Sequence, residues 1–445
     1  MGIGLLIAKN QATLIRFFPF SLVLLLIVVT IFRVELTIPS SDILFFRELS
    51  PQLFPIEPEI LHPIVFLLVT LVFVPLSQEL GRLFRTFTPL VAYTIDIAGA
   101  LTGILAFSLA SYLSLPSSVW FLIVSLTFLP FLAKRGVFVF MVTIWALMVI
   151  PMIAFVSDGA SVWSPYYKLT ISQITDKELG KVYGINANNI GHQYISDYEK
   201  RERFYFAPFD NIENAEYKNV LIIGSGTGAD VATVLAKNPH VERIDAVDID
   251  PKLIELGRLL NPNKPFDDPR VNIIINDGRN VLQNSDKEYD LIIFALTDSV
   301  TITGTSANIR LESFLFTKEA FTLAKNRLSD QGLMVLYNYY REDWLIDKIA
   351  RTLEEVFGEP PYVETYGEYG KAAAFLAGPR TANLASNSKA KLRTTSSTLP
   401  IAQDDWPFIY LTEKTIPAFY VKALLAIIAL SAALVALIAF RGKKI

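Results

Sequence analysis

The chain has 445 residues, of which 52% are hydrophobic and only 19% charged, and this composition is too apolar for an ordinary soluble protein. A formal net charge of −3 excludes a basic surface for a nucleic-acid backbone. The lack of cysteine excludes disulfides and thiolate metal ligands, and His62, His192 and His240 are too scattered to bind a metal together. We therefore expect membrane spans, no nucleic-acid partner and no metal site.

Apolar runs long enough to cross a lipid bilayer occur near both ends of the chain. About 20 residues are needed, and the region 1–157 supplies five candidate spans, at 17–33, 62–78, 89–112, 116–133 and 137–156. The third and fourth come from one uncharged stretch that is divided at 114–118, where a proline among serines favours a turn. A sixth candidate, 423–440, lies in the final segment 413–445. The first run could instead be a signal peptide, but no small-residue cleavage site follows it.

A more charged region, 158–378, separates the two apolar regions. It begins with a small β element at 160–190 and continues with strands that alternate with helices, which predicts a parallel sheet covered on both faces. Residues 379–403 are rich in Ser, Thr and Lys and are expected to be flexible. They complete a segment, 379–412, that returns through Asp404-Asp405-Trp406-Pro407-Phe408. The predicted architecture is an α-helical transmembrane region plus an α/β domain.

A glycine-rich loop follows a buried apolar strand at 220–223 and precedes an expected helix that begins at Ala229. Glycines let a ligand come close to the backbone, and the amides at a helix start can bind its polar atoms. A second strand ends about 20 residues later at an acid that can accept hydrogen bonds from both hydroxyls of a ribose. The sequence therefore predicts a nucleoside site made by the loop and by this strand end: Gly224, Ser225, Gly226, Thr227, Gly228, Asp248 and Ile249.

Two further acids follow the next strands of the expected sheet. Asp277 and Gly278 come after the strand at 271–275, and an acid there suits the amino group of an adenine. Asp298 comes after the strand at 289–294, and ligands of open parallel sheets lie at these carboxyl ends. Asp298 is therefore the candidate for contacting the reacting group. The pattern favours an S-adenosyl-type ligand over a nicotinamide pocket or a vestigial one.

These motifs together resemble the spermidine synthase family, and two later ones resemble its multi-span membrane branch. The quoted segments are 224–228 (Gly-Ser-Gly-Thr-Gly), 247–250, 268–271, 276–278 and 289–293, followed by 310–314 and 404–408. The resemblance implies a Rossmann-like domain of the class I S-adenosylmethionine-dependent transferases. It also implies that Asp248 binds ribose, that Asp277 binds adenine, and that Gln193 and Tyr205 line the amine side. The implied donor is S-adenosylmethionine or its decarboxylated form, and a polyamine is the implied acceptor.

Two positions depart from the family pattern. Thr227 stands where the family has an aspartate that meets the amino end of the decarboxylated donor. Ala295 stands where the family has the aspartate that helps to deprotonate the attacking amine, which leaves only Asp298. An amine is nucleophilic only when unprotonated, so loss of a positioned base costs about 10²-fold or more in rate. The departures disfavour ordinary spermidine synthesis.

Three polar features outside this pattern each have two interpretations. Asp96 lies in the third span with Gly99 and Gly103 on the same face, and it marks either a functional site or, as we prefer, helix packing. Arg310 and Glu312 follow the stretch 301–308, which either closes over the pocket or leads into a salt-bridged helix start. The acids and tryptophan at 404–406 either shut the site or anchor the chain near the membrane interface.

Basic residues predict which side of an inner membrane the α/β domain occupies. With five spans first, nine basic residues fall on one side, and they are Lys9, Arg16, Arg82, Arg85, Lys134, Arg135, Arg441, Lys443 and Lys444. The other side has only Arg33 and Arg47 among several acids. Because basic residues accumulate in the cytoplasm, the pattern places the domain outside it. One span fewer would reverse the side, and the implied cofactor is made in the cytoplasm, so a cytoplasmic domain stays the alternative.

The sequence thus favours a membrane-anchored, spermidine synthase-like transferase that moves an aminopropyl or related group to a small polar acceptor. The second hypothesis is a non-catalytic binding or assembly subunit that keeps the fold outside the cytoplasm, with a membrane protein or a second copy as its partner. A nicotinamide oxidoreductase is disfavoured, because Asp277 has no role in one.

Overall fold

The structure is a computed structural model that describes residues 2–9, 12–32, 58–132, 144, 148–153, 161–176, 180–188, 190–296, 311–340, 342–367, 372–395 and 398–442. Internal contacts divide the chain into two units. A helical unit includes residues 47–167 and 416–445, and an α/β unit comprises residues 168–415.

The helical unit contains the apolar segments. Its elements are α1 (Gly2–Leu6), η1 (Ile7–Lys9), η2 (Ile15–Phe17), α2 (Phe18–Phe32), α3 (Pro58–Leu83), α4 (Pro89–Tyr112), α5 (Ser117–Leu132), β1 (Ser161–Trp163) and α13 (Ala418–Gly442). Among the described residues, three helices are long and apolar enough to cross a membrane, namely Pro63–Leu83, Pro89–Tyr112 and Tyr420–Leu437. The apolar helices α2 and α5 are shorter, and most of the candidate span 137–156 lies outside the described residues. The chain turns between α4 and α5 at Ser114, whose φ is 54°.

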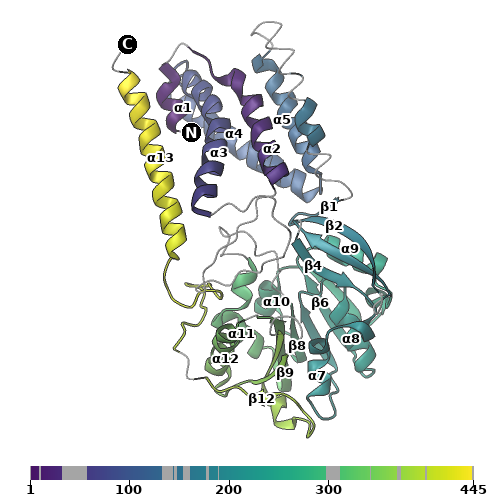
Figure 1. The fold of residues 1–445 in the computed structure, drawn as a ribbon. Coiled ribbons are helices and arrows are strands. Elements are labelled where there is room, and N and C mark those ends of the chain that lie inside the picture. Colours follow the sequence, from purple (N-terminus) through teal and green to yellow (C-terminus); the bar gives the residue numbers. More distant parts are fainter. Residues whose placement is uncertain are drawn as a thin grey trace. The chain divides into compact units, whose positions relative to one another are not determined.

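The first residues of the chain pack against α3. A buried glutamine of α3 makes hydrogen bonds to backbone groups of this N-terminal segment. Gln78 donates from Nε2 to the carbonyls of Ile7 and Ala12 at 3.2 and 2.9 Å, and its Oε1 accepts from the amide of Leu14 at 2.8 Å. A Cβ at Gly4 would lie 2.5 Å from the carbonyl oxygen of Val74, so glycine is required for this close approach. Helix α13 lies beside α3 in the same unit (Figure 1).

The α/β unit is built on a mixed sheet. Its described strands are β5 (Asn219–Ile223), β6 (Arg243–Asp248), β7 (Val271–Ile275), β8 (Tyr289–Ala295), β9 (Leu328–Tyr339), β10 (Tyr362–Tyr366), β11 (Ala372–Ala377) and β12 (Lys391–Leu392), in the order β12-β10-β11-β9-β8-β5-β6-β7. Strands β5 to β9 pair in parallel, whereas β11, β10 and β12 pair antiparallel at one edge. The predicted Rossmann-like fold is confirmed, with an antiparallel edge that the alternating pattern did not predict.

Helices cover both faces of this sheet (Figure 1). One face packs against α10 (Gly278–Asn284), α11 (Lys318–Lys325) and α12 (Asp343–Phe357). The other face packs against α8 (Ala229–Lys237), α9 (Pro251–Leu260), η4 (Arg203–Phe206) and α7 (Ala207–Asp210). Alternate side chains of β5 serve the two faces: Leu221 and Ile223 point to the first core, and Val220 and Ile222 to the second. Burial on both faces explains the continuous apolar runs of the central strands.

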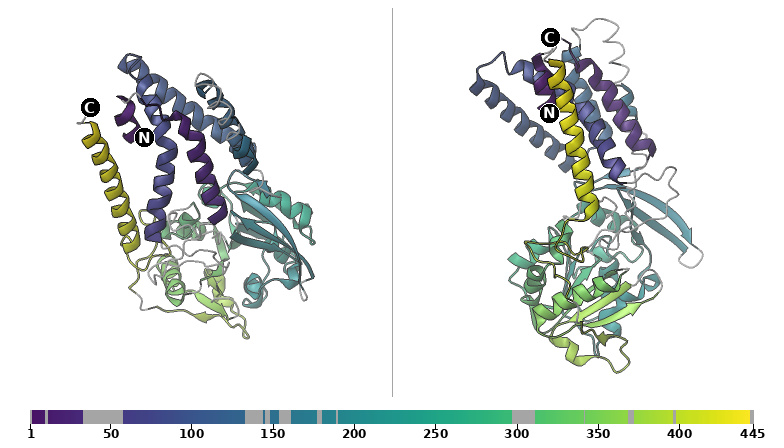
Figure 2. Two further views of the ribbon diagram at one scale, coloured as in Figure 1. Left: turned by 45° about the horizontal axis from the view of Figure 1, so that its top comes forward. Right: turned by 60° about the vertical axis from the view of Figure 1, so that its left-hand side comes forward.

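A separate antiparallel element precedes the mixed sheet. Strands β2 (Lys168–Asp176), β3 (Gly180–Ala187) and β4 (Ile190–Ile195) pair in sequence, as Figure 2 shows. They lead through η3 (Tyr198–Lys200) to η4. The remaining short elements are η5 (Pro265–Asp267), η6 (Leu311–Leu315) and η7 (Pro379–Asn383).

The segment after the last long strand is held by specific contacts, in contrast to the flexibility that its Ser/Thr/Lys-rich composition predicts. Strand β12 pairs with β10, and the hydroxyl of Ser388 donates to the Oδ1 of Asn211 at 2.6 Å. Further along, Lys348 on α12 is only 1% exposed, and its Nζ donates to the carbonyls of Phe408 and Leu411 at 2.9 and 2.7 Å. Burial lowers the pKa of Lys348 from 10.5 to about 7.

We predict that Lys348→Met destabilises the α/β unit, because the carbonyls of Phe408 and Leu411 lose their donor. The cost is about 1–3 kcal/mol, which lowers the thermal midpoint by roughly 2–10 °C. Unfolded lysine keeps its proton up to a pKa of 10.5, whereas buried Lys348 releases it near 7, so Lys348 makes the native protein more stable as pH rises through this window. The variant loses that rise.

Thermal unfolding in detergent at pH 7, 8 and 9 measures both effects. The exposed Lys389→Met is the matched control. An unchanged midpoint together with an unchanged pH dependence would contradict the prediction.

Candidate functional site

The glycine loop is pinned to the end of the neighbouring strand. Gly224, Gly226 and Gly228 have φ values of 80°, 50° and 88°, which non-glycine residues rarely adopt. The amides of Gly224 and Ser225 both donate to the carbonyl of Val247 at 2.9 Å. Gly228 begins α8 without a side-chain cap, and the buried hydroxyl of Ser225 has no hydrogen-bond partner among the described residues. The loop therefore presents polar groups that a ligand can use.

Asp248 closes β6 directly beside this loop. Its Oδ2 accepts from the amide of Gly226 at 2.7 Å, and its Oδ1 accepts from the amide of Asp250 at 2.8 Å. The side chain is buried, and burial raises the pKa of Asp248 to about 6 against the opposing effect of these hydrogen bonds. Ile249, the next residue, is half-buried. Asp248 thus orients the loop, and it sits where the sequence predicts a ribose contact.

Asp277 lies at the next strand end, because β7 pairs with β6 in a register that places Ile275 opposite Asp248. The Oδ1 of Asp277 caps α10 by accepting from the amide of Asn280 at 2.9 Å. A Cβ at Gly278 would lie 2.4 Å from the Cγ2 of Ile223, so this glycine allows α10 to start against β5. The residues predicted to hold ribose and adenine therefore share one edge of the sheet.

Gln193 contacts the loop from the segment before β5, and Tyr205 lies in the same segment. The Oε1 of Gln193 accepts from the amide of Thr227 at 3.1 Å and from its hydroxyl at 2.8 Å. Tyr205 is buried, and its ring packs against Phe204 and Tyr337 at 4.9 and 5.5 Å. Burial raises the pKa of Tyr205 well above its usual value. Thr227 stands where the resemblance implies an aspartate. Its hydroxyl donates a hydrogen bond to Gln193, which an ionised aspartate could not do.

The predicted catalytic acid, Asp298, follows the end of β8 in the sequence. Ala295 is buried at the end of β8, and Leu296 follows with a φ of 45°. Asp298 and Arg310 lie outside the described residues, and Glu312 lies in η6. The structure therefore describes the end of β8 that precedes Asp298, and the catalytic role of Asp298 stays a prediction.

Four residues near the loop were missed by sequence reasoning. The side-chain Nδ2 of Asn261 donates to the carbonyl of Thr227 at 2.9 Å, and a Cβ at Gly257 would lie 2.7 Å from the same oxygen. Gly257 is a glycine inside an amphipathic helix, and in the sequence this glycine indicates that another part of the backbone comes close to the helix. Asp230 is 5% exposed on the first turn of α8, and Arg201 lies nearby before η4. An acid directly after the loop was visible in the sequence, but its burial was not.

Asp404 fastens the returning segment to the α/β unit. Its carboxylate forms a bidentate ion pair with Arg279 of α10, and its Oδ1 also accepts from the hydroxyl of Thr317 at 2.9 Å. The amide of Asp404 donates to Glu319 at 3.0 Å. These contacts hold the start of α10, where Asp277 lies.

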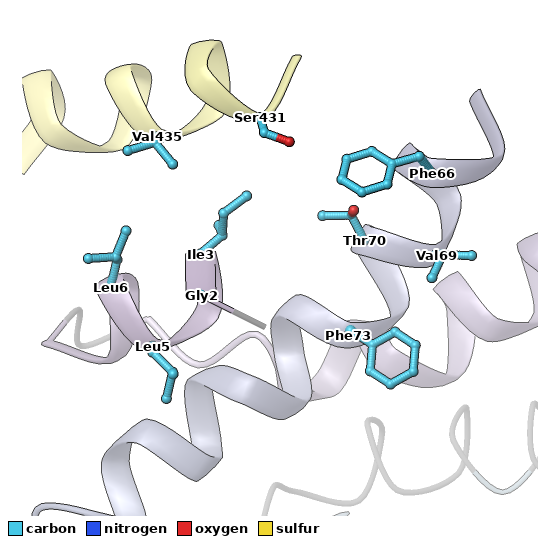
Figure 3. A pocket seen from close by; sticks show the side chains of 10 residues that line it. All are labelled: Gly2, Ile3, Leu5, Leu6, Phe66, Val69, Thr70, Phe73, Ser431 and Val435. Carbon is cyan, nitrogen blue, oxygen red and sulfur yellow. The ribbon is translucent and has the colours of Figure 1, made fainter. Parts of the chain in front are cut away.

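A pocket in the helical unit is chemically different from this site. A pocket of about 890 Å³ lies among α1, α3 and α13 (Figure 3). Its lining is apolar apart from two hydroxyl groups, and consists of Gly2, Ile3, Leu5, Leu6, Phe66, Val69, Thr70, Phe73, Ser431 and Val435. It offers no titratable side chain for group transfer.

Asp96 on α4 is half-buried. A Cβ at Gly99 or Gly103 would meet no atom of the described residues within 4 Å, so these residues show no close helix packing at the two glycines. Among the described residues, no cluster of three or more potential metal ligands occurs.

Comparison with known proteins covers the α/β unit. The family model of the spermine/spermidine synthase domain matches residues 205–376. The polyamine aminopropyltransferases of Clostridium botulinum and Streptococcus uberis are 31% and 34% identical over 181 and 182 residues. These alignments cover 38% and 40% of this chain and 58% and 56% of the relatives, so the chain spans just over half of their length.

The solved structure of spermidine synthase from Thermotoga maritima is similar at 22% identity and a TM-score of 0.39, over 59% of this chain and 86% of that one. Residues 205–376 of this chain are thus similar to the spermine/spermidine synthase domain and to the polyamine aminopropyltransferases of these two organisms.

Proposed function

We propose that the chain is a membrane-anchored transferase that binds an S-adenosyl nucleoside and transfers an aminopropyl or related group to a small polar acceptor. The donor is S-adenosylmethionine or its decarboxylated form. The matched relatives are polyamine aminopropyltransferases, which supports a polyamine as the acceptor.

The observation that carries this proposal is the arrangement at the carboxyl edge of the sheet. Asp248 lies against the glycine loop, and Asp277 lies on the neighbouring strand end. Two acids on adjacent strand ends beside uncapped amides suit ribose hydroxyls and an adenine amino group. The acidic site also disfavours a nicotinamide dinucleotide, for which Asp277 has no role.

In the proposed transfer, the bond between the sulfonium sulfur and the aminopropyl carbon breaks as the bond from the acceptor nitrogen to that carbon forms. Methylthioadenosine leaves, and the nitrogen gives up a proton to a base. Asp298 is our candidate for that base, because Ala295 has no ionisable group.

A non-catalytic binding or assembly subunit is the second candidate. Two residues favour it, because they stand where the resemblance implies acids. Thr227 makes a hydrogen bond to Gln193, and Ala295 is buried. Such a protein binds the nucleoside and turns over none of the donors.

The membrane anchor and the side of the domain belong to the same proposal. Three helices among the described residues are apolar enough to cross a bilayer, and we propose about six spans in the inner membrane. The nine basic residues on one side of the spans support an extracytoplasmic α/β domain.

We predict that the detergent-purified protein binds methylthioadenosine and that Asp248→Asn weakens this binding about 10- to 100-fold, because ribose loses a charged acceptor. The pKa of Asp248 is raised to about 6, so affinity in the unmodified protein falls as pH decreases through 6. The variant loses that dependence. Calorimetry from pH 5 to 8 measures both, with the exposed Asp286→Asn as control. Equal affinity of the variant and the unmodified protein would mean that the ribose assignment is wrong.

We predict that Asp298→Asn abolishes transfer while methylthioadenosine affinity is kept, because the base acts on the acceptor and not on the nucleoside. Product formation from both donors with putrescine as acceptor provides the measurement. Retained turnover in the variant would remove Asp298 from the mechanism, and no turnover in the unmodified protein despite binding would favour the non-catalytic subunit.

The cysteine-free sequence allows a direct test of membrane side. Asp286→Cys places one thiol on the exposed surface of the α/β unit. We predict that a membrane-impermeant maleimide labels this variant in cells whose outer membrane is permeabilised and whose inner membrane is intact. The reason is that the charge pattern places the domain outside the cytoplasm. Labelling only after lysis would place the domain in the cytoplasm.

A further inference from the structure

Several buried polar atoms near the start of α8 have no hydrogen-bond partner in the described part of the chain. They are the Nε and Nη2 of Arg201, the Oδ1 of Asp230 and the hydroxyl of Tyr337. Asp230 is 5% exposed and Tyr337 is fully buried. Unsatisfied buried polar groups cost stability. A group of them with both charges represented therefore indicates a place where a ligand supplies the missing partners.

These atoms belong to one cluster, which we call the Arg201–Asp230 cluster and which consists of Arg201, Tyr205, Asp230 and Tyr337. The guanidinium carbon of Arg201 lies 5.6 Å from the ring centroid of Tyr205, and this ring is 5.5 Å from that of Tyr337. Burial raises the pKa of Asp230 to about 7, and the charge of Arg201 is the main opposing influence. Within the described residues, the Nε and Nη2 of Arg201 make no hydrogen bond to the Oδ1 of Asp230.

The cluster adjoins the glycine loop on its Gln193 side. Asp230 follows Thr227 by three residues, and Thr227 donates to Gln193. The helix that carries Asp230 contacts both η3 and η4, the short helices on either side of Arg201. Thr227 stands where the resemblance implies an aspartate that meets the amino end of the donor, so we take this end of the donor to lie on this side. Arg201 itself precedes the family match, which begins at residue 205.

A donor that ends only in an ammonium group would satisfy Asp230 and leave the guanidinium of Arg201 beside a second positive charge. A donor that also carries a carboxylate satisfies both residues. Its carboxylate accepts from the unpartnered Nε and Nη2 of Arg201, and its ammonium donates to the Oδ1 of Asp230. Guanidinium and carboxylate are matched in geometry as well as in charge.

We propose that the Arg201–Asp230 cluster recognises the α-amino-acid end of the donor, so that the site selects S-adenosylmethionine with its carboxylate over the decarboxylated form. This inference rests on the proposed nucleoside site and specifies its donor. Thr227 is consistent with it, because a second acid at that position would lie close to the donor carboxylate.

Calorimetry on the full chain in detergent tests the inference with three probes: S-adenosylmethionine, its decarboxylated form and methylthioadenosine. We expect S-adenosylmethionine to bind about 10- to 100-fold more tightly than the decarboxylated form. Arg201→Gln removes this preference and leaves methylthioadenosine affinity unchanged, since that nucleoside lacks the amino-acid end. The exposed Arg203→Gln, two residues away, keeps the preference.

Arg201→Lys guards against misfolding, because it keeps the charge and loses the planar fork, and it is expected to retain part of the preference. Equal or tighter binding of the decarboxylated donor by the unmodified protein overturns the inference and leaves the nucleoside site standing. An equal loss of affinity for all three probes in Arg201→Gln means that Arg201 is structural, which also overturns it. Failure of methylthioadenosine to bind the unmodified protein overturns the proposed function itself.

Discussion

The hydrogen bond from the Gly226 amide to the Asp248 carboxylate is the contact on which the α/β site depends. It ties the loop after β5 to the end of β6, and it requires a backbone that only glycine adopts easily at this position, with φ of 50°. Asn261 and Gly257 hold the other side of the same loop through the Thr227 carbonyl. The loop is therefore fixed from two directions before any ligand arrives, which lowers the entropic cost of binding.

The α/β fold and the positions of the glycine loop and of the strand-end acids could be predicted because they depend on local signals. Glycines that require positive φ, an acid at a strand end and continuous apolar strands are all visible along the chain. The antiparallel edge could not be predicted, because the direction of β10, β11 and β12 is set by how the connections fold back. The order of residues 379–395 could not be predicted either, because this polar segment is held by tertiary contacts. Strand β12 pairs with β10, and Ser388 makes a hydrogen bond to Asn211.

Buried charged groups were the least predictable part of the site. Lys348 and Asp230 have the sequence context of solvated helix residues, yet both are buried. Their burial follows from which helix face meets the sheet or the preceding segment, and that is decided by tertiary packing. Gln78 in α3 is the corresponding case in the helical unit, where a polar side chain satisfies backbone carbonyls from the start of the chain in an apolar setting. Asp298 was predicted only from its position after β8, whose end at Ala295 the structure describes.

The ion pair between Arg279 and Asp404 has a consequence for how the protein is made. Arg279 and Asp277 lie at the start of α10, and the contact that braces this start comes from a residue 125 positions later in the chain. The family match ends at residue 376, before that contact. During synthesis, the central strands and the glycine loop emerge first, whereas the start of α10 gains its last brace only after residue 404 has left the ribosome. The α/β unit therefore depends on the segment that leads into α13, and a chain cut at the end of the family match would lose both β12 and this brace.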